Sequence, residues 1–249
     1  MISTVVTNFI IILLLVGISD ADPRSQIVKL TCDQPPVNNQ TIAIPNFLQT
    51  MTKIGTQLRS SHSGTAVPGT GPDAMYGLGE CYGDLSTDDC VLCYAEARTM
   101  LPTCFPEFGR IHLDGCFMRM NNYSFYEEYI GAEDMTYCGD KTMSGGVFQD
   151  SVRRAVSNAV MNAPKNSDFF AKELSSGAYV LADCWNSLNE TYCVDCLERA
   201  SESILKCLPA SEGRALYAGC FLRYSDTNFL NQESTPANNG GKFQTFMSC

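Results

Sequence analysis

Residues 81–93 read CYGDLSTDDCVLC, and residues 184–196 read CWNSLNETYCVDC. Both stretches place three cysteines in the pattern C-x8-C-x2-C, and a fourth cysteine follows eleven positions after the third in each case. The flanking sequence repeats as well, because Gly109-Arg110 precedes the last cysteine of the first set as Gly213-Arg214 precedes that of the second. Two homologous modules, about 105 residues apart, explain this agreement.

Six cysteines fall in each repeat, and the thirteenth, Cys249, has no counterpart. In an oxidising compartment six cysteines predict three disulfides per module, and their spacing alone permits 15 pairings. A bridge that closes about 70 residues is worth about 4 kcal/mol in the loop-entropy model, which matters to a module with a modest core. Cys249 either pairs between chains or stays free. The cysteines are Cys32, Cys81, Cys90, Cys93, Cys104 and Cys116, then Cys138, Cys184, Cys193, Cys196, Cys207 and Cys220.

The pairs Cys90/Cys93 and Cys193/Cys196 also have the spacing of a redox dithiol or of half a zinc site. Thiols outside the cell usually oxidise, and zinc needs four ligands. Structural disulfides are therefore the favoured interpretation, with a thiol redox sensor as an alternative. We expect no metal site and no cofactor.

The N-terminus and the charge indicate an extracellular protein. The apolar run at residues 9–16 is shorter than the ~20 residues of a membrane-spanning helix and is typical of a signal peptide, which we place at residues 1–21. No later apolar stretch is long enough to span a membrane. Net charge is −10, which disfavours binding to nucleic acid. Acceptor triplets at Asn39, Asn122 and Asn189 predict N-glycosylation of a secreted chain.

Composition and spacing also divide the mature chain. We predict the first module at residues 26–130, the second at residues 134–229 and a polar C-terminal tail at residues 230–249. The linker is short, so the modules are expected to pack against each other.

Periodicity predicts helices and strands in both modules. We expect a helix capped by Asn46, and Ser86 with Asp89 forms a capping box for another. The apolar stripes lie at Phe47, Met51, Ile54 and Leu58, and at Val152, Val156, Ala159 and Val160 before Pro164. Strands are predicted at residues 74–82, 110–120, 123–130, 178–185 and 214–224, and solvated loops at 64–72 and 231–242.

Candidates for catalysis are few. The two histidines, His62 and His112, have no counterparts in the second module, and no H-E-x-x-H, G-x-S-x-G or phosphate-binding loop occurs. The acidic pairs Asp88-Asp89 and Glu127-Glu128 are adjacent in sequence, which suits solvated faces better than an acid/base pair. Trp185 is expected to pack near the disulfide at Cys184. We therefore predict no enzyme and no catalytic residue.

The duplicated cysteine motif, the upstream first cysteine and the Gly-Arg before the last one resemble the plant-specific ginkbilobin-type family, also called domain of unknown function 26. The resemblance covers residues 30–225. It implies an α+β fold of two tandem modules, each with two helices packed on a five-stranded antiparallel sheet and three disulfides. The implied pairs are Cys32–Cys104, Cys81–Cys90, Cys93–Cys116, Cys138–Cys207, Cys184–Cys193 and Cys196–Cys220.

Ginkbilobin itself binds mannose and is antifungal, through an Asn, an Arg and a Glu. The matching positions are Asp33, Arg110 and Asn121 in the first module, and Gly139, Arg214 and Ser225 in the second. Only the arginines agree, so mannose is not expected at the second module. Asp33, Arg110 and Asn121 are the candidate ligand-binding residues. The alternative for both arginines is a strand arginine paired with a nearby carboxylate.

These features predict a secreted, non-enzymatic binding protein of the plant apoplast in defence or stress signalling. Its expected partner is a cell-wall carbohydrate or the ectodomain of an extracellular receptor protein. An antifungal mannose-binding lectin and the thiol redox sensor are the alternatives. The sequence leaves the ligand and the oligomeric state open.

Overall fold

The computed structural model describes residues 24–231 of the chain. The predicted signal peptide at residues 1–21, Cys249 and all but the first two residues of the predicted tail lie outside the described residues.

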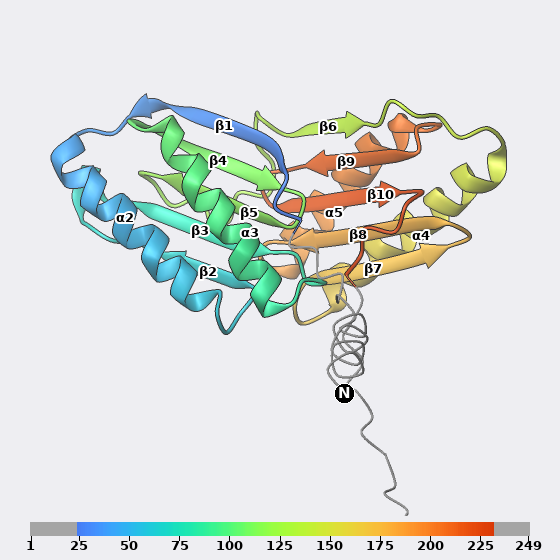
Figure 1. Ribbon diagram of the computed structural model, residues 1–249, viewed down its shortest axis with the longest axis horizontal. Helices are drawn as coiled ribbons and strands as arrows, with labels where there is room; N and C mark the ends of the chain where they lie inside the picture. Colours follow the sequence, from blue (N-terminus) through green and yellow to red (C-terminus); the bar gives the residue numbers. More distant parts are fainter. Residues whose placement is uncertain (1–23, 232–249) are drawn as a thin grey trace, which may run out of the picture.

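The first module is a single antiparallel sheet with two helices (Figure 1). The strand order is β1-β4-β5-β3-β2. The strands are β1 (Ile27–Pro36), β2 (Ser63–Ala66), β3 (Tyr76–Cys81), β4 (Glu107–Leu113) and β5 (Cys116–Asn121), and the helices are α2 (Gln40–Gln57) and α3 (Thr87–Met100).

The second module repeats this arrangement element by element. Its strand order, β6-β9-β10-β8-β7, is the first order with each strand replaced by its counterpart. The predicted fold class is therefore confirmed. The strands are β6 (Met135–Cys138), β7 (Phe170–Ser175), β8 (Ala178–Cys184), β9 (Glu212–Leu216) and β10 (Cys220–Ser225), and the helices are α4 (Gly146–Asn162) and α5 (Glu190–Ile204).

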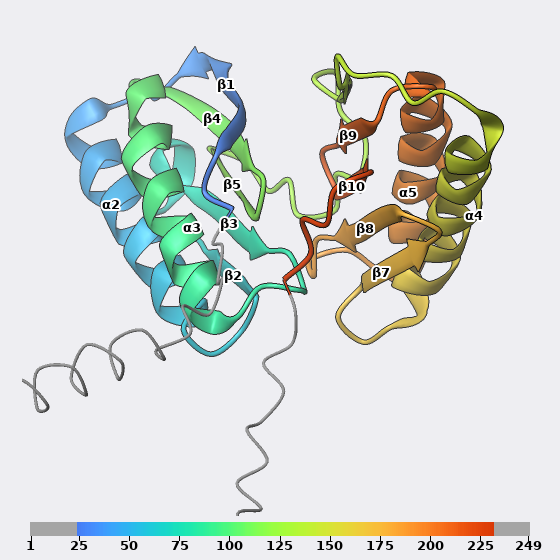
Figure 2. The ribbon, with the colours of Figure 1, turned by 45° about the vertical axis from the view of Figure 1, so that its right-hand side comes forward.

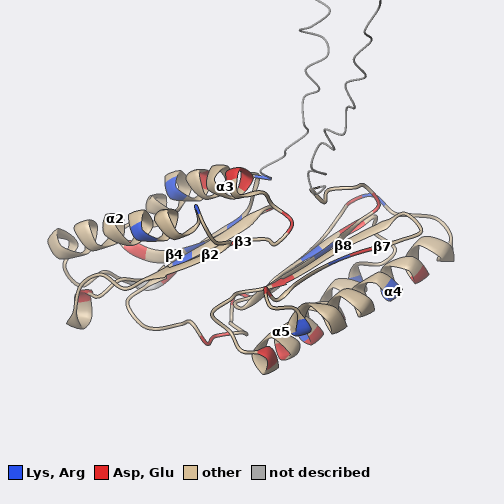
Figure 3. Ribbon diagram, turned by 90° about the horizontal axis from the view of Figure 1, so that it is seen from below, with Lys and Arg blue, Asp and Glu red and all other residues tan. Residues whose placement is uncertain are grey.

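Helices cover one face of each sheet. The helix-free face of each sheet, called its outer face, meets that of the other sheet. Figure 2 shows the modules side by side, and in Figure 3 α2 and α3 lie above one sheet while α4 and α5 lie below the other. A buried cluster that includes Leu78, Phe117, Leu181, Trp185 and Phe221 joins the sheets. The modules thus pack against each other in four layers, as the short linker predicts.

Six disulfides fasten α3, α5 and the turns that follow them to their own sheets. In the first module Cys81–Cys90 joins the end of β3 to α3, Cys93–Cys116 joins α3 to β5, and Cys32–Cys104 joins β1 to the turn after α3. The second module has the same three connections, and no described disulfide crosses between modules. These pairs equal those that the family resemblance implies. The second set is Cys138–Cys207, Cys184–Cys193 and Cys196–Cys220.

The helix starts show one correct and one incorrect prediction. The predicted cap at Ser86 is confirmed, since its Oγ accepts from the backbone N–H of Asp89 at 3.1 Å and donates to the Asp89 carboxylate. The predicted cap at Asn46 is wrong, because the helix begins at Gln40 and Asn39 caps it by accepting from the N–H of Thr41. Asn46 instead lies inside the helix and donates to the carbonyl of Asp73 at 2.9 Å.

The apolar stripes lie where periodicity places them. Phe47, Met51, Ile54 and Leu58 are buried in the first module, as are Val152, Val156 and Ala159 in the second, where Val160 is half-buried.

Three strand predictions need correction. Residues 110–120 and 214–224 each form a hairpin, β4-β5 and β9-β10, and not one strand. Residues 123–130 contain no strand, because Phe125 and Tyr126 pack in the cluster between the sheets while the backbone pairs with no neighbouring strand. The predicted loop at 64–72 begins with the edge strand β2.

Candidate ligand-binding site

Four stacked aromatic rings fill the centre of the interface between the sheets. In order they are Phe221, Tyr82, Trp185 and Phe117, with centroid distances of 4.4, 6.3 and 4.5 Å and near-parallel planes. Each module contributes two rings. Trp185 is 1% exposed and donates its indole N–H to the carbonyl of Ala218. It is therefore part of the joint between modules and unavailable to stack on a sugar.

The first-module candidate residues lie on the outer face of that sheet, and two of them come together. Arg110 forms an ion pair of 3.6 Å with Asp33, and both side chains are largely buried. Asn121 is 6% exposed, and its side-chain oxygen accepts from the N–H of Asn122. The alternative prediction, an arginine paired with a nearby carboxylate, is confirmed for Arg110 and also for Arg214, which binds Asp114 and Glu212.

The segment at residues 122–134 covers this face. Arg119, next to Arg110 across the β4-β5 pair, is 1% exposed. Its guanidinium lies 4.1 Å from the ring centroid of Phe125, forms an ion pair of 2.8 Å with Glu128 and donates to the hydroxyl of Tyr123. Ligand access to the first module therefore requires this segment to move.

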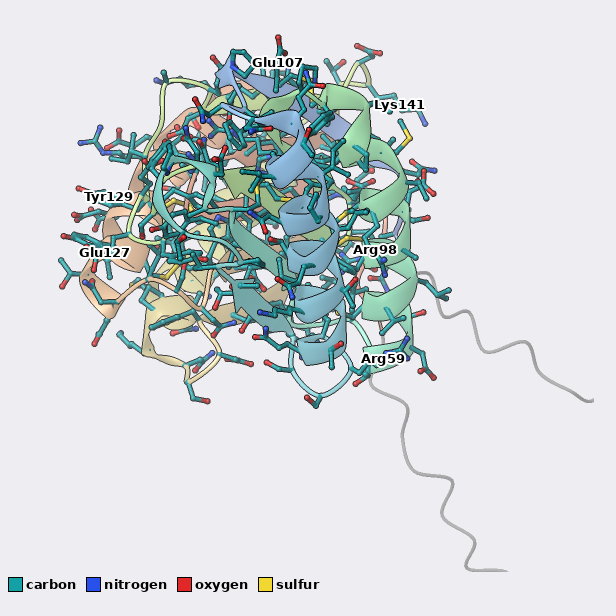
Figure 4. All side chains as sticks on the ribbon, turned by 90° about the vertical axis from the view of Figure 1, so that its left-hand side faces the viewer. Arg59, Arg98, Glu107, Glu127, Tyr129 and Lys141 are labelled. Atoms are coloured by element: carbon teal, nitrogen blue, oxygen red, sulfur yellow. A yellow bond between two sulfur atoms is a disulfide. The ribbon has the colours of Figure 1, made fainter. Side chains whose placement is uncertain are left out.

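One member of each acidic pair is bound by a neighbouring side chain, although Glu128 is still partly exposed. Glu128 binds Arg119, and Asp89 is 4% exposed against Ser86. The partners Glu127 and Asp88 are exposed, and Figure 4 shows Glu127 pointing outward close to Tyr129. Tyr129 stacks on Tyr192 of α5 at 4.7 Å, so the same segment also contacts the second module.

The second module has the equivalent arginine, Arg223, which is 8% exposed and also lies against an aromatic ring. Arg223 lies 4.0 Å from the ring centroid of Phe229, which is nine positions after Cys220 as Phe125 is nine after Cys116. Burial lowers the pKa of Arg223 to about 10, so it remains charged at neutral pH. Its guanidinium lies within 3.6 Å of both Asp114 and Glu212.

A cavity of about 360 Å³ lies beside Arg223. Two of the three second-module positions, Gly139 and Ser225, line it, whereas Arg214 is held next to it by Asp114. Polar groups, hydroxyls and charged groups among them, make up about half of its wall, with apolar atoms the rest. The other polar lining residues are Asp140, Lys141, Ser211, Glu212, Asp226 and Thr227.

A larger and more open hollow of about 600 Å³ lies at the edge strand β7. In its wall Asn162 donates to Glu173 and Asn166 donates to the carbonyl of Phe170. Because the cavity beside Arg223 contains two of the three second-module positions, we take it as the candidate binding site.

The histidines and the repeat cysteines have structural contacts within residues 24–231. His62 contacts the carbonyl of Leu85 at 2.8 Å, and His112 packs on Phe117 with burial lowering its pKa to about 3. Within residues 24–231, no cluster of three His, Cys, Asp or Glu side chains is suited to hold a metal ion. All twelve repeat cysteines are in disulfides.

The family model described as salt stress response/antifungal matches residues 31–123 and 137–227, one match per module. The chain belongs to this family. It is 53% identical over 219 residues to cysteine-rich receptor-like protein kinase 2 of Arabidopsis thaliana. The aligned region covers 85% of this chain and 34% of the kinase. This member of the salt stress response/antifungal family thus spans about a third of the length of that relative.

Two other similarities fit the same family. The antimicrobial ginkbilobin-2-like protein of Castanea crenata is 26% identical over 72% of this chain and 78% of its own. The tandem ectodomain of the Arabidopsis thaliana cysteine-rich receptor-like protein PDLP5 superposes with a TM-score of 0.68 at 20% identity, over 80% of this chain and 98% of its own. The latter shows the shared fold of two tandem modules. In the part of the chain that the structure describes, no helix has the length and apolar character to cross a membrane.

Proposed function

We propose that this chain is a non-enzymatic binding protein of the plant apoplast that recognises a cell-wall glycan through the cavity of its second module. The role in defence or stress signalling rests on the family and on the receptor-like and antimicrobial relatives. The glycan proposal is supported chiefly by the hydroxyls and charged groups in the wall of an open cavity at a position that the covered first module does not offer.

The cavity wall suits a ligand with many hydroxyl groups. Carboxylates of Asp140 and Asp226 accept hydrogen bonds, Lys141 donates them, and the hydroxyls of Ser225 and Thr227 do both. The half-buried ring of Phe229 supplies an apolar surface for the C–H face of a sugar. A volume of about 360 Å³ falls within the range of small-molecule sites.

The set Asp33, Arg110 and Asn121 is the site of the alternative function, an antifungal mannose-binding lectin. The antimicrobial relative favours this alternative. It requires residues 122–134 to leave the first sheet, because Glu128 and Phe125 hold Arg119 next to Arg110.

The glycosylation sites are compatible with the proposed extracellular location. Asn39 and Asn189 are exposed and cap α2 and α5 through their side-chain oxygens, at 3.0 Å from the N–H of Thr41 and 2.9 Å from that of Tyr192. Capping through oxygen leaves the amide nitrogen to carry a glycan. Asn122 is half-buried beside Asn121.

A glycan array with the secreted protein tests the proposal. Cell-wall glycans should bind, and the double variant Asp226→Ala/Thr227→Ala should weaken that binding at least tenfold. The matched control, Asp33→Asn with Arg110→Gln on the covered module, should bind as the wild type does. Absence of binding to every glycan would sink the proposal, and loss of mannose binding only in the control would support the lectin instead.

A further inference from the structure

Two carboxyl groups occupy equivalent positions in the modules and reach across the joint in opposite directions. Glu80 precedes Cys81 at the end of β3, and Asp183 precedes Cys184 at the end of β8. Glu80 accepts from the backbone N–H of Asn186 at 2.9 Å, and Asp183 accepts from that of Gly83 at 2.9 Å. Asn186 and Gly83 are themselves equivalent, each two residues after the cysteine. Each module therefore offers one carboxyl to the backbone of the other.

Both carboxyls are removed from water. Glu80 is 1% exposed and Asp183 is 3% exposed. Within residues 24–231, neither forms an ion pair with a lysine or an arginine. Burying an ionised carboxylate without a cation is costly, whereas the neutral acid is buried at a much smaller cost.

The groups that face them do not supply compensating positive charge. Glu80 is opposite Ser63 of β2 and Phe117 of β5, and Asp183 is opposite Phe170 of β7 and Phe221 of β10. The charged groups that act on Asp183 are all acidic, namely Glu80, Asp84 and Asp168. Asp84 is already paired with Arg24.

Burial raises the pKa of Glu80 to about 8. The hydrogen bonds from Asn186 lower this pKa, but by less than burial raises it. Burial also raises the pKa of Asp183 well above its ordinary value, and the neighbouring acids add to this against the hydrogen bond from Gly83. When Glu80 is protonated, reversal of the Asn186 amide lets the acid O–H donate to the amide oxygen. The backbone N–H of Asn186 continues to donate to the other carboxyl oxygen.

We propose that Glu80 and Asp183 form a pH-sensitive clamp, which holds the modules together while both carboxyls are protonated and lets them part as the carboxyls ionise. The pKa of Glu80 is higher in the folded state than its ordinary value of 4.5. The stability that this carboxyl contributes is therefore fully present below about pH 4.5, and it is lost as pH rises towards 8. The described disulfides lie within modules, so each module keeps its fold when the joint opens. This clamp is independent of the proposed glycan site.

Trp185 provides the test, since it is the only tryptophan and lies in the joint. Between pH 5 and pH 8.5, its emission should shift to the red while far-UV circular dichroism stays constant. The double variant Glu80→Gln/Asp183→Asn should show no such shift, and the control Glu127→Gln, an exposed carboxyl, should behave as the wild type does.

Two further measurements on the unmodified protein keep the test independent of how the variant folds. Its melting temperature should fall by about 5 °C or more between pH 5 and pH 8, and its radius of gyration from solution scattering should increase. An unchanged emission maximum and radius of gyration across this range would overturn the proposal. So would an identical red shift in the folded double variant.

Discussion

Arg214 of β9 donates two hydrogen bonds across the joint to Asp114, the residue that follows β4, at 2.8 and 3.2 Å. Burial lowers the pKa of Arg214, but the hydrogen bonds and charges of Asp114 and Glu212 outweigh it and raise that pKa above its ordinary value. Ala218 takes the place of Asp114 in the second module, so the repeat does not reproduce this ion pair. The arginine that the family resemblance associates with sugar binding here holds the two modules together.

Removing Asp114 should therefore weaken the joint. Asp114→Asn leaves Arg214 and Arg223 with only Glu212, and we expect the free energy of unfolding to fall by about 3 kcal/mol, since the pair is largely buried. Urea unfolding followed by Trp185 emission measures this. Arg153→Gln on the exposed face of α4 is the control and should change little. Equal stability of Asp114→Asn and the control would contradict a stabilising role.

The repeat makes much of the fold predictable, because cysteine spacing and the apolar stripes of α2 and α4 are local features of sequence. The contact between the two outer faces joins residues far apart in the sequence, so no local pattern predicts it. All six residues of β5 and of β10 are buried, so these central strands lack the alternation of polar and apolar residues that would identify an exposed face. Residues 123–130 have the composition of a strand for a related reason, since Phe125 is buried and Tyr126 is half-buried without strand pairing.

The cavity beside Arg223 is not predicted from the sequence, for a different reason. Its wall combines Gly139 after β6 with Ser225 at the end of β10 and Thr227 just after it, residues that are far apart in the sequence. In the first module Glu128 and Phe125 cover the equivalent arginine. The linker supplies this cover, and no motif in the sequence specifies its path.

Disulfides of different span should contribute unequally. Cys32–Cys104 closes a separation of 72 residues, whereas Cys81–Cys90 closes one of 9. In the loop-entropy model their losses cost about 4 and about 3 kcal/mol, so the double serine variant of the first pair should be the less stable by about 1–2 kcal/mol. Urea unfolding of the two variants gives this difference. The reverse order would show that packing around α3, and not chain entropy, determines the contribution of each bridge.

Asn189 should serve both as a helix cap and as a glycan acceptor. Asn189→Asp keeps the oxygen that accepts from Tyr192 and removes the acceptor nitrogen, while Asn189→Ala removes both. Both variants should lose one glycan by mass spectrometry of the secreted protein. Only the alanine variant should lose about 1 kcal/mol of stability, measured on enzymatically deglycosylated samples. A wild-type chain without sugar at Asn189 would contradict the modification.

Gly83 should be sensitive to a single added methyl group, because it lies against Phe170 of the other module. A Cβ at this position would overlap the ring of Phe170 on β7, and it would also disturb the N–H that Asp183 accepts from. Gly83→Ala should destabilise the joint by about 1–3 kcal/mol, the usual cost of overpacking. Gly146→Ala is the matched control, since no heavy atom lies within 4 Å of its added Cβ and alanine favours the helix that begins there. Thermal unfolding of the two variants measures the contrast, and a Gly83→Ala protein as stable as Gly146→Ala would show that the two sheets can separate slightly without loss of stability.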